Sequence, residues 1–279
     1  GSEMCIRDSA WYENDGAANP TWTTANIVTN ADGAWDVHIA DVDHDGDLDI
    51  ISGSVIDDTI RWHENNGASD PTFATASIAT SADYPTGIHL ADIDSDGDID
   101  VIAAVEDSNS LVAWWENDGS PSGAIWDQHN IDTDLSQPHS VYAIDMDSDG
   151  DMDVVGSDGG SGDPADDVFW WENSGNPEGA WTSYKIDSNY NGAWGVHAVD
   201  IDFDGDIDVV ASATTRGDIS WFENKKVGDI TAKLNDDVNQ LERFLDNGFN
   251  SIIQLCVSTV AIGCWFFYIS PLVASITIL

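Results

Sequence analysis

The stretch Asp41-Val42-Asp43-His44-Asp45-Gly46-Asp47-Leu48-Asp49 decides how this chain folds. It alternates carboxylates with other side chains around one glycine, in the pattern D-x-D-x-D-G-D-x-D. The same pattern recurs at residues 92–100, 145–153 and 200–208, and the four starts lie 51, 53 and 55 residues apart. A fixed pattern at a near-constant spacing indicates one structural unit that is repeated along the chain.

The alternating carboxylates predict a cage of hard oxygen atoms, which suits Ca2+. The Asp side chains at loop positions 1, 3 and 5 are expected to point inward, and the glycine at position 6 to turn the chain. Position 7 can then offer its backbone carbonyl, and the Asp at position 9 closes the site. We therefore expect about four calcium ions, one for each complete loop. The candidate metal ligands are Asp41, Asp43, Asp45, Asp47, Asp49, Asp92, Asp94, Asp96, Asp98, Asp100, Asp145, Asp147, Asp149, Asp151, Asp153, Asp200, Asp202, Asp204, Asp206 and Asp208.

Two other interpretations of the loops are weaker. A solvated acidic turn that binds nothing would explain one copy, but four copies with no ligand position altered argue against it. An EF-hand needs a bidentate Glu at position 12 and flanking helices. Position 12 here is Ser52, Ala103, Gly156 or Ala211, and each loop runs into a β-branched apolar stretch such as Ile50-Ile51. The loop therefore leads into a strand.

The rest of each unit predicts further short strands. A short apolar stretch precedes every loop, and about a dozen residues after the loop comes the motif Trp-aromatic-Glu-Asn, at residues 62–65, 114–117, 170–173 and 221–224. A glycine two residues after the Asn is a turn signal, and a last strand carries Phe73, Trp126 or Trp181. Four short strands in about 50 residues are typical of a β-propeller blade. The recurring Trp residues are expected to pack blade against blade, with carbohydrate stacking as the alternative.

The order of these motifs resembles the FG-GAP/VCBS repeats of bacterial surface and secreted proteins, and the same loop occurs in the propeller of integrin α-subunits. The resemblance covers about residues 10–224. It implies an all-β propeller with one Ca2+ between the first and second strand of each blade. The implied ligands are Asp41, Asp43, Asp45, Asp47 through its carbonyl, and Asp49, with the matching sets in the other loops. Such propellers serve adhesion and ligand binding and also occur in polysaccharide-degrading enzymes, so the fold does not choose between these functions.

The N-terminal region predicts a fragment of a larger ring. Residues 1–9 resemble the translation of a transposase adapter and are excluded from the fold, so a signal peptide is not observable. Residues 11–14 are a fifth Trp-aromatic-Glu-Asn motif without a loop before it, which indicates a partial blade ahead of four full ones. As an alternative, residues 21–29 supply the outer strand that the last copy lacks and close a small ring.

The C-terminal region has a different composition. Apolar residues at steps of three and four over 225–250 predict an amphipathic linker helix. Residues 251–279 carry no charge over 29 positions, which is long enough for a transmembrane segment, with a buried helix as the alternative. The four basic residues that precede this span favour a cytoplasmic propeller. Calcium at the millimolar level found outside cells favours the opposite orientation, which we adopt: an extracellular or cell-surface propeller with a C-terminal membrane anchor.

The charge of residues 10–224 limits the partners. They contain 45 acidic and three basic side chains, a formal net charge of -42, and no Cys. Such a surface repels nucleic acid and anionic lipids. We expect a cell-surface protein or a glycan as the partner, and contact with the membrane only through the C-terminal helix.

No catalytic residue is assigned, and an enzyme is the less favoured interpretation. His38, His89, Tyr142 and His197 lie three residues before the loops and are candidates for lining a central channel. They obey the repeat, whereas catalytic groups usually differ from one another, so packing is favoured over a ligand or transition-metal site. The sequence thus favours a calcium-binding adhesion or binding module. The alternatives are the propeller portion of a secreted lyase or hydrolase, and a structural spacer.

Overall fold

The computed structural model describes residues 9–106, 110–121, 125–159 and 166–224 of the chain. This part is all-β, with seventeen strands in five antiparallel sheets. Four of the sheets each contain one Asp loop, and we number them blades 1 to 4 in chain order. The predicted linker helix over 225–250 and the transmembrane segment over 251–279 lie outside the described residues.

Every blade begins with the strand before an Asp loop, and the loop connects it to the second strand. Blade 1 contains β3 (Ala34–Ala40), β4 (Asp49–Ser54), β5 (Thr59–Asn65) and β6 (Phe73–Ala79). Blade 2 contains β7 (Pro85–Ala91), β8 (Asp100–Val105), β9 (Leu111–Glu116) and β10 (Asp127–Asp132). Blade 3 contains β11 (Pro138–Ile144), β12 (Asp153–Asp158), β13 (Asp167–Glu172) and β14 (Thr182–Asp187). Blade 4 contains β15 (Ala193–Val199), β16 (Asp208–Ala213) and β17 (Asp218–Phe222), and a separate hairpin contains β1 (Ser9–Asn14) and β2 (Trp22–Val28).

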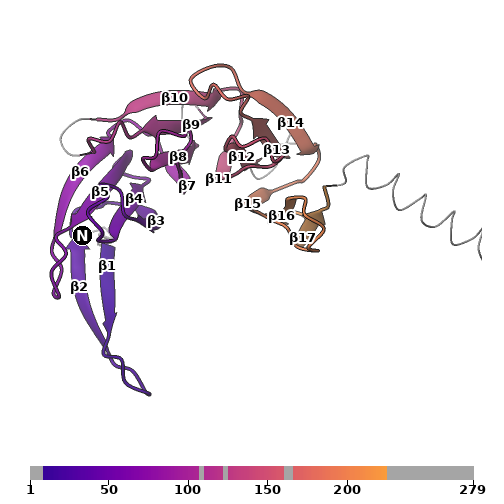
Figure 1. Ribbon diagram of the computed structural model, residues 1–279. Coiled ribbons are helices and arrows are strands. Elements are labelled where there is room, and N and C mark those ends of the chain that lie inside the picture. Colours follow the sequence, from indigo (N-terminus) through magenta and orange to yellow (C-terminus); the bar gives the residue numbers. More distant parts are fainter. Residues whose placement is uncertain (1–8, 107–109, 122–124, 160–165, 225–279) are drawn as a thin grey trace, which may run out of the picture. The chain divides into compact units, whose positions relative to one another are not determined.

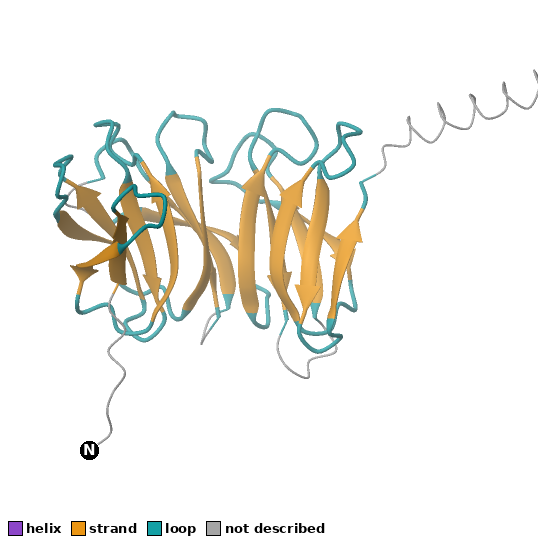
Figure 2. Cartoon of the chain, turned by 90° about the horizontal axis from the view of Figure 1, so that it is seen from below, coloured by secondary structure: helices purple, strands orange, loops and turns teal. Residues whose placement is uncertain are grey.

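These sheets confirm the prediction of antiparallel sheets that resemble propeller blades. Of the four predicted full blades, three have four strands, whereas blade 4 has three strands among the described residues. The strands of each blade pair in chain order, so the Asp loop and the Asn-containing turn after the third strand lie at the same end of the sheet. Figure 2 shows the loops gathered at the two ends of the strands. The second strands β4, β8 and β12 are buried along their whole length. A strand covered on both faces is apolar on both, which explains the β-branched run after each loop.

The blades of residues 9–224 lie side by side in chain order (Figure 1). Their first strands β3, β7, β11 and β15 adjoin one another, and we call this row of four strands the inner edge. Backbone approach at the inner edge is close: a Cβ on Gly87 of β7 would lie 2.5 Å from the His139 carbonyl oxygen of β11. A glycine is therefore required there for space, which lets two blades meet.

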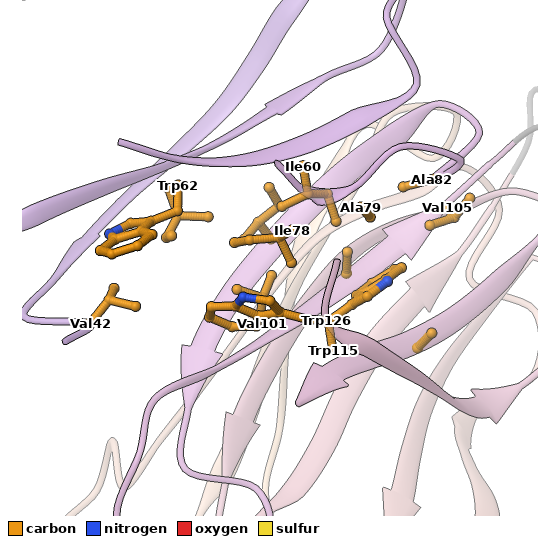
Figure 3. Close-up of a cluster of buried hydrophobic side chains, with 14 residues drawn as sticks. Val42, Ile60, Trp62, Ile78, Ala79, Ala82, Val101, Val105, Trp115 and Trp126 are labelled. Atoms are coloured by element: carbon orange, nitrogen blue, oxygen red, sulfur yellow. The ribbon is translucent and has the colours of Figure 1, made fainter. Parts of the chain in front are cut away.

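In blades 2 and 3, the Trp-aromatic motif packs in the seams with both neighbouring blades. Trp62 packs with Val42 of its own blade against Val101 and Trp115 of blade 2 (Figure 3). The next motif begins with Trp114, which packs toward blade 3 in a second cluster. Since successive side chains of a strand point to opposite faces, adjacent Trp114 and Trp115 enter two different seams. This arrangement confirms the predicted packing of blade against blade. Burial of each large apolar side chain contributes roughly 1.5–3 kcal/mol.

The first and last blades expose residues whose counterparts are buried in the internal seams. On β3, Val37 is 58% exposed, whereas the corresponding Ile88 of blade 2 is 2% exposed. On β17, Ile219 is 77% exposed, whereas the corresponding Ile60 of blade 1 is fully buried. Equivalent positions of different blades thus carry similar apolar side chains, and these are buried only where a neighbouring blade covers them.

The alternative in which residues 21–29 complete the last blade is wrong. Residues 22–28 form β2, which pairs with β1 from Asn14 opposite Trp22 to Ser9 opposite Val28. The motif at 11–14 lies on β1 and makes the same hairpin with the following strand that β5 makes with β6, because a short loop favours the strand nearest in sequence. No helix among the described residues is long and apolar enough to cross a membrane.

Candidate metal-binding loops

The first carboxylates of each loop converge on one point. In each loop, one oxygen atom from each of three carboxylates lies within 4.8 Å of the other two. The three carboxylates are those of positions 1, 3 and 5 in loops 1 and 2, and those of positions 1, 3 and 9 in loops 3 and 4. The groups are Asp41, Asp43 and Asp45; Asp92, Asp94 and Asp96; Asp145, Asp147 and Asp153; and Asp200, Asp202 and Asp208. Positions 1 and 3 therefore belong to the cluster in all four loops. In the described part of the chain, these are all the clusters of at least three His, Cys, Asp or Glu side chains.

Backbone geometry explains the convergence. The N–H of the position 6 glycine donates to the position 1 carboxylate over 3.1 Å in every loop, as from Gly46 to Asp41. The N–H of position 5 donates to position 3, and the N–H of position 7 to position 5. Each carboxylate is thus held by a backbone group two or five residues ahead, which curls the loop around the oxygen atoms.

Two residues of each loop have left-handed backbone conformations. The glycines at position 6 have φ between 95° and 102°, as predicted, and a Cβ there would meet nothing within 4 Å. The glycine is therefore needed for its dihedral angle and not for space. Position 4 is also left-handed, with φ of 59° at His44 and 61° at Phe203, which sequence inspection missed because this residue varies. A bulky, 89% exposed Phe203 at such an angle stores strain.

The Asp at position 9 has a second role besides closing the cluster. Asp49, Asp100, Asp153 and Asp208 are fully buried. One oxygen of this Asp accepts the N–H of loop position 2, and the other accepts the N–H of the motif Asn. For Asp100, the donors are Ile93 and Asn117, each at 2.9 Å. The same two bonds occur in all four copies. Position 9 therefore fastens the loop to the end of the third strand.

The position 7 side chain leaves the cluster. A Cβ on Gly67 would lie 2.0 Å from Asp47 Oδ2, and Gly119 and Gly175 stand in the same relation to Asp98 and Asp151. The glycine two residues after the motif Asn thus makes room for the position 7 carboxylate in addition to turning the chain. A side chain directed at this glycine is compatible with the prediction that position 7 binds through its carbonyl.

The electrostatics of the loops favour a cation. Burial, together with neighbouring carboxylates, raises the pKa of the position 3 residues Asp43, Asp94, Asp147 and Asp202. Burial raises the pKa of Asp100 to about 7 and that of Asp153 to about 6, although backbone N–H groups oppose the shift. Asp41 Oδ1 and Asp92 Oδ1 are buried and have no hydrogen-bond partner. A buried carboxylate oxygen without a donor is costly unless a cation neutralises it, so the residues present fit a divalent ion.

The Asn of the Trp-aromatic-Glu-Asn motif connects neighbouring loops. Asn117 Nδ2 donates to the Ile99 carbonyl of its own loop over 3.3 Å and to the Val42 carbonyl of the preceding loop over 3.2 Å. Asn173 repeats this with Met152 and Ile93. The Asn side chain oxygens accept the N–H of the glycine two residues on, which confirms the turn signal. The recurrence of this Asn in every copy was the only sequence feature that could have indicated a bond between loops, and a role in the turn accounted for the recurrence equally well.

The four candidate channel residues come together as a row of contacting rings along the inner edge, with edge-on or tilted contacts. Ring centroids are 5.8 Å apart from His38 to His89, 4.3 Å from His89 to Tyr142 and 4.4 Å from Tyr142 to His197. His89 Nδ1 accepts the N–H of Ala143 from the next blade over 3.2 Å. Burial, and then the charges of His38 and His197, lower the pKa of His89 to about 4. These contacts support the packing interpretation, in which the rings join one blade to the next.

Comparison with known proteins agrees with this repeat structure. The FG-GAP-like repeat family matches residues 6–52 and 92–156, which contain the first three loops. The structure extends the same loop geometry to the fourth loop at residues 200–208. The ABC transporter transmembrane region matches residues 210–279; of these, the structure describes residues 210–224, which include the last residues of β16 and all of β17. A comparison with curated proteins finds no match. The repeated loop, the blade architecture and the family match together show that this chain contains FG-GAP-like repeats within residues 6–52 and 92–156.

Proposed function

We propose that each of the four Asp loops binds one calcium ion and that the blades form a calcium-stabilised binding or adhesion module. The observation that carries this proposal is the pair of buried, unpartnered oxygens Asp41 Oδ1 and Asp92 Oδ1 beside converging carboxylates. The ions would be held by loop positions 1, 3, 5 and 9 and by the position 7 carbonyl. A bound calcium ion supplies positive charge that offsets the mutual repulsion of these carboxylates.

The fold explains why such ions would matter for binding. The loops and the Asn turns lie at the same end of the blades, so ions in the loops would hold that end rigid and present a constant surface to a partner. A cell-surface protein or a glycan remains our proposed partner, because the net charge of -42 over residues 10–224 disfavours nucleic acid. The row of rings on the inner edge follows the repeat, which supports a binding module over the propeller portion of a polysaccharide-active enzyme.

The location of the module is part of the proposal. Calcium sites in extracellular modules fill at roughly 10⁻⁴–10⁻³ M, which suits the outside of the cell. The uncharged residues 251–279 and their similarity to a transporter membrane region support a membrane anchor. Deletion of residues 251–279 should release the protein from membranes into the aqueous fraction. If the shortened chain still sediments with membranes, the anchor is assigned wrongly.

Calcium titration calorimetry on the full chain tests the metal proposal. We expect about four bound ions per chain and a higher melting temperature in calcium than in chelator. Absence of binding, together with equal melting temperatures in both conditions, would show that the loops are acidic turns only. A screen of surface glycans and proteins in calcium and in chelator then tests the binding role, because a true partner should be lost when calcium is removed.

A further inference from the structure

The loops of blades 1, 2 and 3 are joined by a continuous series of hydrogen bonds that the isolated repeat does not predict. Val42 lies between two candidate ligands of loop 1. Its N–H donates to Asp49 of the same loop, and its carbonyl accepts Asn117 Nδ2 from blade 2. Val42 of loop 1 therefore contacts both the position 9 Asp of its own loop and a side chain of the next blade.

The series continues through loop 2 into loop 3. The backbone N–H of Asn117 donates to Asp100, and Asp100 also accepts the N–H of Ile93. The Ile93 carbonyl accepts Asn173 Nδ2 of blade 3 over 3.5 Å, and the Asn173 N–H donates to Asp153. Each step uses a loop position 2 residue, a position 9 Asp and a motif Asn, so the route repeats from one blade to the next.

The bridging side chains are well placed to transmit a constraint. Asn117 is 1% exposed and Asn173 is 2% exposed. An amide that donates two bonds in a buried position cannot exchange them for water without cost, so movement of one loop disturbs the other. Asn65 of blade 1 is less buried, and its Nδ2 donates to Leu48 of its own loop.

A second contact joins the first two loops at the surface. His44 at position 4 of loop 1 lies 3.4 Å, from Nδ1 to Oδ1, from Asp98 at position 7 of loop 2. Loops 2 and 3 have Ser95 and Ser148 at the position of His44. The buried Asn bridges are therefore the connection that recurs between both pairs of loops.

We propose that divalent cations bind to loops 1, 2 and 3 with positive cooperativity, and that the Asn117 and Asn173 side chains carry the coupling. This inference rests on the proposed calcium function. A cation that orders loop 1 fixes the Val42 peptide, which fixes Asn117 and through it the carbonyl of Ile99 and the carboxylate of Asp100. Loop 2 then starts from an ordered state and loses less conformational freedom when it binds its own ion. Coupling of this kind is reciprocal, so loop 2 favours loop 1 equally.

The test is calcium titration of the full chain as wild type, Asn117→Ala and Asn65→Ala. Asn65→Ala is the matched control, because it removes the same amide and the bond within one loop but no bond between loops. We expect a Hill coefficient above one for wild type and Asn65→Ala, and a clear decrease for Asn117→Ala. Coupling between sites typically changes affinity by roughly 5- to 150-fold, so in wild type the second ion should bind measurably more tightly than the first.

A second variant keeps the test valid if Asn117→Ala does not fold. Asp96→Asn changes an exposed candidate ligand of loop 2 and leaves both Asn bridges in place. In saturating calcium, hydrogen exchange at the Gly46 N–H of loop 1 and the Gly150 N–H of loop 3 should become faster than in wild type, whereas Gly205 of loop 4 should change less.

The outcomes separate this inference from the proposed function. Four ions that bind independently, with identical curves for Asn117→Ala and Asn65→Ala, would overturn the coupling and leave calcium binding intact. Equal exchange in loops 1 and 3 for Asp96→Asn and wild type would overturn it as well. A chain that binds no calcium would overturn both proposals.

Discussion

At the scale of single residues, the loops depend on which carboxylate oxygens already have a donor. Asp100 gives both oxygens to backbone N–H groups, whereas Asp92 keeps one buried oxygen without a partner. The same side chain type therefore serves two purposes within nine residues. Position 9 fastens the loop to its blade, and positions 1 and 3 supply charge at the point where the loop curls.

Replacing one exposed carboxylate of the cluster should separate metal binding from folding. Asp45→Ala removes a clustered carboxylate of loop 1. We expect a loss of about 2–3 kcal/mol when calcium is present at about 100 times the dissociation constant, because the loop-1 contribution of the ion disappears. In chelator the change should stay within about 0.5 kcal/mol, as for other surface substitutions. Urea unfolding under both conditions measures this.

The neighbouring Asp47→Ala is the control for that experiment. It keeps the position 7 carbonyl and removes a side chain that points at Gly67 and away from the cluster. Its loss in calcium should be smaller than that of Asp45→Ala. Equal losses for Asp45→Ala in calcium and in chelator would count against direct ligation.

His63 should make stability depend on pH. It is fully buried between Ser52 and Thr75, and burial, followed by the charge of Arg61, lowers its pKa to about 4. An unfolded His has a pKa near 6.5, so between these values the unfolded chain binds a proton that the folded chain does not. The contribution is fully present above about pH 6.5 and is lost as the pH falls toward 4, about 3 kcal/mol in total.

A non-titrating variant isolates this effect from the many carboxylates. The unfolding free energy of His63→Gln, measured in saturating calcium, should fall less steeply than that of wild type between about pH 6.5 and pH 4.5. The difference between the two curves should reach about 2–3 kcal/mol at the lower end. Parallel curves for the two proteins would show that His63 does not stay neutral in the folded state.

At the scale of the elements, one position on β3, β7 and β11 carries a residue whose size fits the distance to the next blade. Asp36 of β3 accepts the N–H of Ile88 on β7, and Ser140 of β11 accepts the N–H of Val196 on β15. The corresponding residue of β7 is Gly87. There the strands approach directly, and His89 accepts the N–H of Ala143 in place of the missing side chain.

Gly87→Ala should therefore open the seam between blades 2 and 3. The added Cβ would lie 2.5 Å from a backbone oxygen and 2.9 Å from Ser140 Cα, neither of which can move alone. We expect a loss of about 1–3 kcal/mol in the free energy of unfolding. Gly195→Ala at the same position of blade 4 is the control, because its Cβ would meet Ser212 Oγ at 3.2 Å. Thermal melts that rank Gly195→Ala as the more damaging change would contradict this account of the seam.

At the scale of the whole molecule, self-repulsion opposes the packed blades. Residues 10–224 have a formal net charge of -42, and four calcium ions would reduce it to -34. Raising sodium chloride from about 0.1 M to about 1 M shortens the Debye length from about 10 Å to about 3 Å. We expect the melting temperature to rise with salt, and to rise more in chelator than in calcium. A melting temperature that falls with salt in chelator would show that surface repulsion is not limiting.

Much of this architecture could be predicted because the same sequence pattern occurs four times. The spacing of the Asp loops and the Trp-aromatic-Glu-Asn motif predicted antiparallel blades, the loop between first and second strands, and the packing function of Trp62 and Trp114. Local chemistry sufficed here: glycine at position 6 has few substitutes at positive φ, and adjacent strand residues face opposite sides. The candidate metal ligands follow from the same local pattern.

Tertiary structure alone decided what depends on a neighbouring blade. The row of rings from His38 to His197 required four strands from four repeats to adjoin, and the Asn117 bridge to Val42 joins residues 75 positions apart. Pairing of β2 with β1 also excluded the alternative in which residues 21–29 close a small ring. Periodicity within a chain specifies what each blade presents on its faces. The atoms of the next blade that those faces contact depend on the distance between the two backbones. That distance cannot be derived from the sequence of either repeat alone.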